Sequence, residues 1–221
     1  SNNLSIAAKK INGTVLLPGE TFSYNKVVGE RTIAAGYKEA GAYAGGKVIQ
    51  SVGGGICQIS STLYNTALLA NLEIVYRSNH QFETGYVAAS RDATVSWPGL
   101  DFKFKNTRTY PIKIVASAKS GVAKISIYGI KEETEYEVVI QSKVLSYIPN
   151  TTKYIEDSSL EEGKEVVEQS GHNGCQSEAY RILKLNGKVV SKTLLSRDTY
   201  DAMQTIIRRG TKKKVTTPTT P

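Results

Sequence analysis

The chain contains 221 residues and carries a formal net charge of +8; 40% of its residues are hydrophobic and 22% are charged. This length accommodates one or two domains with a hydrophobic core, and the composition is that of a globular protein. No apolar run approaches the roughly 18 residues that a membrane-spanning helix needs. The excess of Lys and Arg favours polyanionic partners: nucleic acid, anionic lipid or an acidic cell-wall polymer. Because basic and aromatic residues are not interleaved as in single-strand binders, we expect no nucleic-acid partner.

The first half of the chain predicts an α+β fold. Periodicity favours a short amphipathic helix over residues 4–11, then a strand over residues 14–17 that ends at the turn pair Pro18-Gly19. Residues 23–43 contain several glycines and predict turns, whereas apolar residues three and four positions apart predict a helix after Cys57. This order predicts a cysteine-bearing helix packed on a mainly antiparallel sheet. The expected strands of this half span residues 72–76, 93–96, 102–105, 112–118 and 123–128.

The second half predicts a small, extended all-β domain. Alternating apolar and polar residues and glycine turns replace any long helical pattern, and Asn186-Gly187 is a strong signal for a hairpin turn. We therefore expect one domain at 1–132, a β domain at 133–210 and a basic, Thr- and Pro-rich disordered tail at 211–221. The expected strands of the β domain span residues 136–142, the vicinity of residue 147, 165–168, 180–185 and 189–195.

Three glycines that lead directly into Cys57 indicate a reactive thiol. Cys57 falls at the start of the predicted helix, where free backbone N–H groups and the helix dipole stabilise a thiolate and lower its pKa. Glycines also let the backbone approach a substrate closely and direct N–H groups toward an oxyanion. The alternative is a buried, unreactive cysteine after a flexible loop. The candidate substrate contacts around the thiol are Gly54, Gly55, Gln58 as an oxyanion donor, and Tyr64.

His80 is the only histidine in the first half and is the candidate base for Cys57. It follows the strand after the cysteine helix, and antiparallel packing of that helix and strand would return His80 to the start of the helix. Asp92 could orient His80 as the third member of a triad, and Arg91 could bind a substrate carboxylate. Alternatively, Arg91 and Asp92 form a charged loop.

The second cysteine and second histidine, Cys175 and His172, give no metal-binding spacing, and no Cys-x-x-Cys pair exists. We expect His172 to be a turn residue. The sequence predicts no metal site and no other cofactor.

Three segments resemble the VanW family: residues 12–23 (NGTVLLPGETFS), 53–65 (GGGICQISSTLYN) and 91–95 (RDATV). The resemblance spans roughly residues 4–130, and the glycine–cysteine segment is its most specific part. The second half resembles the G-five domain, a module of secreted bacterial proteins that is associated with glycan binding. The five glycines that carry this second resemblance are Gly163, Gly171, Gly174, Gly187 and Gly210.

The VanW resemblance implies a cysteine-dependent L,D-transpeptidase that forms 3–3 cross-links between the tetrapeptide stems of peptidoglycan. With water as acceptor, the same site would be an L,D-carboxypeptidase. Cys57 matches the family's catalytic cysteine, His80 is our assignment by position, and Arg91 and Asp92 match a family motif. The resemblance further implies stem peptides and wall glycan as partners, a membrane anchor outside this sequence, and an extracellular, wall-associated or membrane-anchored location on a Gram-positive bacterium. We expect a monomer.

Two alternative functions stay open. The chain could be a non-catalytic wall-binding or scaffolding module in which Cys57 is buried or paired with Cys175. Such a disulfide would need contact between the two domains, which no sequence feature indicates. The chain could also be another cysteine-dependent wall peptidase or amidase.

Overall fold

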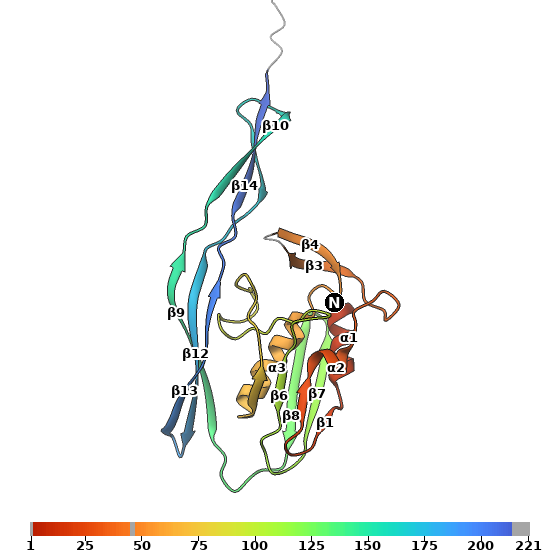
Figure 1. The fold of residues 1–221 in the computed structure, drawn as a ribbon, viewed down its shortest axis with the longest axis vertical. Helices are drawn as coiled ribbons and strands as arrows, with labels where there is room; N and C mark the ends of the chain where they lie inside the picture. The colour runs from red at the N-terminus through yellow and green to blue at the C-terminus, as the bar shows by residue number, and fades with distance from the viewer. Residues whose placement is uncertain (1, 45–46, 214–221) are drawn as a thin grey trace, which may run out of the picture.

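The structure is a computed structural model that describes residues 2–44 and 47–213. Figure 1 shows an elongated molecule in which helices occur in the first half of the described chain and the second half consists of strands. The α+β class of the first half and the all-β class of the second are therefore confirmed. Of the expected tail, residues 211 and 212 close the last strand, whereas residues 214–221 lie outside the described part. No helix in the described ranges is long and apolar enough to cross a membrane.

The first domain begins with an amphipathic helix on an antiparallel sheet. Helix α1 (Asn2–Ile11) buries Leu4, Ala7, Ala8 and Ile11, whose spacing places them on one face. Strands β1 (Val15–Leu16), β7 (Ile112–Lys119) and β8 (Val122–Gly129) form a sheet of order β1-β7-β8. Along β7 buried and exposed residues alternate, which gives the sheet one face toward the core.

A second small sheet and two further helices complete the core of this domain. Strands β2 (Thr21–Ser23), β6 (Lys103–Lys105) and β5 (Glu73–Tyr76) pair in the order β2-β6-β5. Ser23 caps the short helix α2 (Tyr24–Val28) by accepting a hydrogen bond from the N–H of Lys26. Helix α3 (Cys57–Leu69) buries Ile59, Leu63, Ala67 and Leu68 in the same core.

The prediction of turns over residues 23–43 holds for residues 29–38, where Gly29 and Gly36 have positive φ, and is wrong on either side. The segment also contains α2 and the start of a hairpin formed by β3 (Glu39–Ala44) and β4 (Lys47–Val52). Strand β3 lies close to the loop before α3. A Cβ on Gly54 would lie 2.3 Å from the carbonyl oxygen of Ala40.

The expected strand at residues 93–96 is also absent from the described structure. Side chains of α3 bind the backbone of Ala93, and the N–H of Thr94 donates to the carbonyl of Ser78 at 2.9 Å, so the segment forms no continuous ladder with a strand. Ser60 Oγ donates to the carbonyl of Ala93 at 2.6 Å, and Ser61 Oγ accepts from the N–H of Ala93 at 2.9 Å. The segment therefore lies against the N-terminal half of α3.

The second domain consists of two three-stranded sheets that follow each other along the long axis of the molecule (Figure 1). Strands β9 (Glu137–Ile148), β12 (Gly174–Leu185) and β13 (Lys188–Tyr200) form an antiparallel sheet of order β13-β12-β9. The hairpin turn between β12 and β13 is at Asn186-Gly187, as predicted, and both residues have positive φ. Strands β10 (Thr152–Glu161), β14 (Thr205–Lys212) and β11 (Glu165–Gln169) form the distal sheet, of which β10 and β14 were not predicted.

The two domains are in contact, which the sequence did not indicate. Ile140 of β9 and Leu195 of β13 pack against the core of the first domain. Arg181 of β12 donates from Nη1 to the carbonyl of Leu72 at 2.9 Å. This sheet therefore lies alongside the first domain, close to the loops that follow α3 and β5.

Candidate active site

Cys57 is the first residue of helix α3. The preceding residue, Ile56, offers no side-chain cap. Within the described chain, the backbone N–H groups of Gly55 and Cys57 donate to no carbonyl or side chain. These N–H groups and the positive end of the helix dipole favour negative charge at this position.

The Cys57 sulfur lies against the extended segment at residues 93–96. The N–H of Val95 donates to Sγ at 3.5 Å, and Oγ1 of Thr94 lies 3.7 Å from Sγ. The carbonyl of Val95 is 3.6 Å away and accepts from the protonated thiol. In addition to His80, two groups that can donate a hydrogen bond to sulfur therefore flank Sγ of Cys57.

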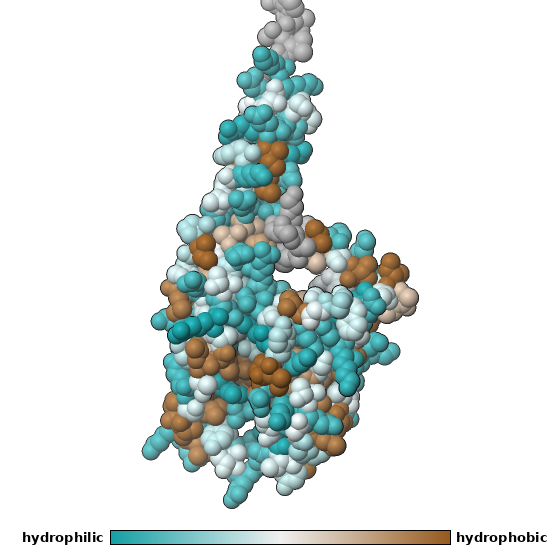
Figure 2. All heavy atoms as spheres, in the orientation of Figure 1, coloured by the Kyte–Doolittle hydropathy of each residue, from teal (hydrophilic) through white to brown (hydrophobic). Residues whose placement is uncertain are grey.

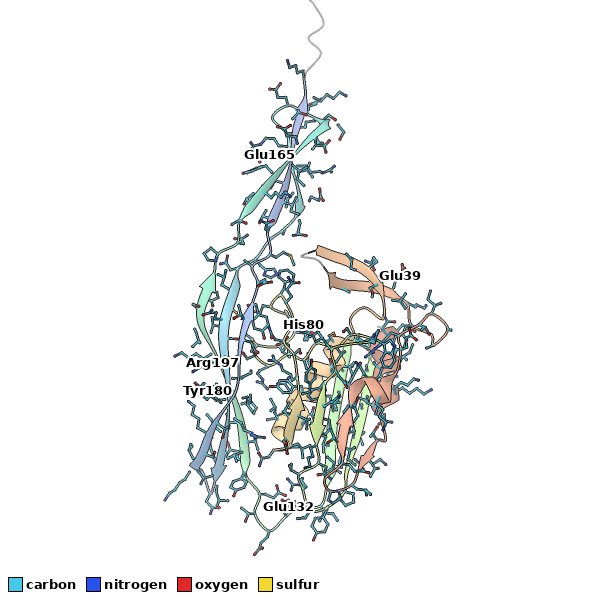
Figure 3. The ribbon with its side chains drawn as sticks, viewed as in Figure 1. Glu39, His80, Glu132, Glu165, Tyr180 and Arg197 are labelled. Atoms are coloured by element: carbon cyan, nitrogen blue, oxygen red, sulfur yellow. The ribbon has the colours of Figure 1, made fainter. Side chains whose placement is uncertain are left out.

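His80 lies close to Cys57 and contacts a buried carboxylate. The imidazole lowers the pKa of the Cys57 thiol, and its Nδ1 lies 2.6 Å from Oδ2 of Asp92. The N–H of His80 donates to the same oxygen at 2.6 Å. Because Nδ1 of His80 is bonded to Asp92, Nε2 is the ring nitrogen that remains for the thiol. Figure 3 shows His80 between the two domains.

The pKa values of the pair shift in opposite directions. Burial raises the pKa of the Cys57 thiol, but the hydrogen bond and positive charge of His80, with the donors at Val95 and Thr94, bring it below its usual value. Burial lowers the pKa of His80, but the bonds to Asp92 and Cys57 outweigh this and raise it to about 9. These opposite shifts favour the thiolate–imidazolium form of the pair over the neutral form.

Asp92 is almost entirely buried, with 2% of its side chain exposed. Its Oδ1 accepts from Nη2 of Arg77 at 2.7 Å and from the hydroxyl of Tyr200. Burial raises the pKa of this carboxyl, but the bonds to His80, Arg77 and Tyr200 lower it below its usual value. Asp92 therefore stays ionised and fixes the tautomer and orientation of His80.

The sulfur and the imidazole open into a cavity of about 950 Å³. Figure 2 shows the surface hollowed between the β3–β4 hairpin and the second domain. Hairpin residues line one side of the cavity and Thr199 and Asp201 of the second domain line the other. Gly54 and Gly55, two of the expected substrate contacts, lie on its wall. This volume is sufficient for a peptide of several residues.

Three expected substrate contacts do not line this cavity. Tyr64 is 2% exposed and packs edge-on against Phe102 in the core. Arg91 donates from Nε to Oδ1 of Asn65 at 2.7 Å and is not among the residues that line the cavity. Gln58 follows Cys57 in the helix and is not part of the lining either. The expectation that these three side chains bind substrate stays a prediction.

Sequence reasoning missed two cavity residues. Tyr86 places its hydroxyl 3.4 Å from Nε2 of His80. Arg31 is the one Lys or Arg among the described lining residues, and it lies between the rings of Tyr24 and Trp97. Its Nη2 donates to Asn25, while Nε and Nη1 are buried without a partner among the described residues. Neither residue lies in a recognisable motif, so no sequence signal marked them.

The remaining cysteine and histidine lie in the second domain, outside the lining of this cavity. Both cysteines are unpaired, and the sulfur of Cys175 is buried 3.7 Å from Oε2 of Glu83. Burial and this carboxylate raise the pKa of Cys175 to about 11. His172 forms an isolated β-bridge with Met203. The two cysteines therefore have opposite properties, since only Cys57 has a lowered pKa.

Comparison with known proteins gives matches for both domains. The model of the family described as VanW like protein matches residues 1–128, and that of the G5 domain matches residues 131–212. An uncharacterized protein of Bacillus subtilis, YoaR, is 48% identical over 128 residues, covering 58% of this chain and 42% of its own length. The vancomycin B-type resistance protein VanW of Enterococcus faecalis is 33% identical over 130 residues, which cover 56% of this chain and 47% of the length of that protein. The chain therefore spans less than half the length of these relatives.

Among solved structures, the G5 domain of an IgA1 protease covers 37% of this chain and 98% of its own, at 28% identity and a TM-score of 0.25.

Proposed function

The chain belongs to the VanW family and carries a G5 domain, and we propose that it is a cysteine-dependent L,D-transpeptidase of peptidoglycan. The observation that carries this proposal is the Cys57–His80–Asp92 arrangement at the wall of a peptide-sized cavity. A lowered thiol pKa beside a raised imidazole pKa is the arrangement of an activated nucleophile and its acid–base partner. The vancomycin-resistance relative supports a role at the cell wall.

In the first half-reaction, the Cys57 thiolate attacks the carbonyl of the third residue of a tetrapeptide stem. The developing oxyanion is within reach of the N–H groups of Gly55 and Cys57, which have no other acceptor in the described chain. The C–N bond to the terminal D-alanine breaks, and protonated His80 gives its proton to the leaving amine. The products are a thioester on Cys57 and free D-alanine.

In the second half-reaction, the side-chain amine of the third residue of a neighbouring stem attacks the thioester. Neutral His80 takes the proton of the attacking amine, and the C–S bond breaks to restore the thiolate. A 3–3 cross-link results. If water attacks in place of the amine, the product is a shortened stem and the reaction is that of an L,D-carboxypeptidase.

The carboxylates of the stem need a cation in the cavity, and Arg31 is the candidate. It is the one Lys or Arg among the described residues that line the cavity, and its Nε and Nη1 are bonded to no described group. This role replaces the one expected of Arg91, whose Nε is bonded to Asn65. The G5 domain would add contact with wall glycan, at an extracellular location.

The proposal is tested by mass spectrometry of products after incubation with purified disaccharide-tetrapeptide. Wild type should give a cross-linked dimer and free D-alanine, and Cys57→Ala should give neither. Cys175→Ala is the matched control and should behave as wild type, because Cys175 is buried outside the cavity lining. Loss of D-alanine without dimer would restrict the reaction to hydrolysis. Cleavage elsewhere in the stem would indicate a different wall peptidase, and no reaction would favour a binding module.

A further inference from the structure

The last residues of strand β13, in the second domain, face the candidate active site. Asp198 and Tyr200 are two positions apart, so they share one face of the strand, and both are buried. Arg197, directly before Asp198, points to the opposite face, where it pairs with Glu178 and 72% of its side chain is exposed (Figure 3). The buried face of β13 therefore presents a phenol and a carboxylate to the first domain.

Tyr200 bonds directly to the third member of the triad. Its hydroxyl donates to Oδ1 of Asp92 and accepts from the N–H of Ser90 at 2.7 Å. Ser90 has a positive φ, a backbone conformation that needs support from its surroundings. Its hydroxyl also lies 2.6 Å from that of Ser177 in β12. The second domain therefore holds both the carboxylate of Asp92 and the backbone just before it.

Asp198 acts on the same carboxylate through Arg77. Nη1 of Arg77 donates to Asp198 at 2.6 Å, and its Nη2 donates to Oδ1 of Asp92 at 2.7 Å. Nε of Arg77 donates to the backbone carbonyl of Asp92 at 2.6 Å. With Oδ1 held by Arg77 and Tyr200, Oδ2 is turned toward His80. Of these two donors, Tyr200 belongs to the second domain, and Arg77 is paired with Asp198 of that domain.

The loop that carries His80 is bonded to the second domain on both sides of the histidine. Asn79 donates to the carbonyl of Thr199 at 2.9 Å. The N–H of Asp201 donates to the carbonyl of Gln81 at 2.7 Å. Both members of the His80–Asp92 pair are thus placed by contacts that cross the domain boundary.

We propose that the second domain is part of the catalytic site, in which Tyr200 and Asp198 position Asp92, and through it His80, against the Cys57 thiol. Tyr200 and Asp198 are positioning residues, because they act through Asp92 and Arg77. The inference rests on the proposed function only in taking Cys57 as the reactive group.

The test is the pH profile of alkylation of Cys57 by iodoacetamide in the full chain, followed by peptide mass spectrometry. The variant is Tyr200→Phe, which removes one hydroxyl and keeps the ring. Tyr180→Phe is the matched control, because its hydroxyl bonds to Glu178 of the same sheet. Asp198→Asn gives a second, independent variant, and thermal unfolding monitors the fold of each.

The other titratable groups facing the thiol or the imidazole are Tyr24, Arg31 and Tyr86, and burial raises the pKa of both tyrosines.

Tyr200→Phe should alkylate about fivefold more slowly than wild type at pH 7, the order of effect of one lost hydrogen bond, with its midpoint shifted to higher pH. Asp198→Asn should shift in the same direction, and Tyr180→Phe should match wild type. The same midpoint and rate in Tyr200→Phe and wild type, or a midpoint shifted to lower pH, would overturn the inference. Because the readout needs no cell-wall substrate, a wild-type protein without cross-linking activity would count against the proposed function and leave this result interpretable.

Discussion

Cys57 and His80 stabilise each other's charge, and the surrounding groups add to this effect. The sulfur receives the N–H of Val95, while the imidazole is bonded to an aspartate that is itself held by Arg77 and Tyr200. Burial alone would raise the thiol pKa and lower that of the imidazole. The pKa of the thiol is instead lowered and that of the imidazole is raised. The interaction between the two groups and their hydrogen bonds therefore outweighs the effect of burial.

His80→Gln should remove the charge partner and the acid–base group together. We expect cross-linking to fall by about 10²–10⁴, the usual contribution of general acid–base catalysis, and thiol alkylation at pH 7 to slow as the thiol pKa rises. The measurement is the initial rate of dimer formation beside the rate of alkylation. His172→Gln is the control, since His172 lies in a β-bridge of the second domain and is not part of the cavity lining. Unchanged alkylation in His80→Gln would contradict the ion pair.

The activity should show a bell-shaped dependence on pH. The lowered thiol pKa means that thiolate is present at pH values below those of an ordinary cysteine. The pKa of His80, raised to about 9, means that the imidazolium needed to protonate the leaving amine is lost as pH rises through that value. The acylation rate should therefore rise as the thiol ionises and fall as pH rises through about 9. Release of D-alanine in single-turnover reactions measures this, and a rate that continues to rise above pH 9 would be incompatible with His80 as the acid.

Much of this site could be predicted from residue types. Three glycines, a cysteine at a helix start and a histidine after the next strand are local signals, and they predicted Cys57 and His80 together with Asp92. Arg31 and Tyr86 carry no such signal, because tertiary packing alone brings them to the cavity. Sequence order does not tell which of two neighbouring side chains faces the histidine; in the structure Asp92 faces His80 and Arg91 faces Asn65.

Among the structural elements, the hairpin and helix α3 meet at Gly54. Ala40 and Gly41 of β3 approach so closely that a Cβ on Gly54 would lie 2.3 Å from one carbonyl oxygen and 2.9 Å from the other. Backbone atoms cannot move aside as a flexible side chain can. The hairpin is therefore fixed at its base against the loop that delivers Cys57.

Gly54→Ala should displace the hairpin or the loop and destabilise the protein. We expect a loss of about 1–3 kcal/mol, in the range of overpacked sites, and slower alkylation of Cys57. Gly85→Ala is the control from the same cavity wall, where an added Cβ meets nothing within 4 Å. Denaturant unfolding of the two variants beside wild type provides the comparison. Equal stability of the two variants would show that the close approach does not constrain the fold.

Element types were predicted best where the pattern was long. Helix α1, strands β7 and β8, and the β12–β13 hairpin follow directly from periodicity and turn residues. The strand expected at 93–96 is absent because serines of α3 bind the backbone of Ala93 and only one further bond, from Thr94 to Ser78, joins the segment to the chain after β5. Strand β10 was missed because it is largely exposed and its alternation is weak.

In the whole molecule, Arg77 links the two domains through buried charges. It lies between Asp92 of the first domain and Asp198 of the second, and 6% of its side chain is exposed. The Arg77–Asp198 pair joins residues 121 positions apart. The sequence shows where the two domains begin and end, but it does not show which of their residues are in contact.

Arg77→Met should be strongly destabilising, because it leaves two buried carboxylates without their shared partner. We expect a loss of about 3–5 kcal/mol, the usual cost of removing one partner of a buried ion pair. Arg91→Met is the matched control, since Arg91 is only half-buried and its side chain bonds to the neutral Asn65. Denaturant unfolding gives both free energies. A loss below about 1 kcal/mol in Arg77→Met would mean that the two carboxylates are solvated without it.

The most direct test of the proposed chemistry is intact-protein mass spectrometry during reaction with a tetrapeptide stem. We predict a covalent adduct with the mass of the stem less D-alanine, located on the peptide that contains Cys57. The adduct should form in wild type and Cys175→Ala and be absent from Cys57→Ala. An adduct that persists in Cys57→Ala, or cross-linking by that variant, would contradict the assignment of Cys57 as the nucleophile.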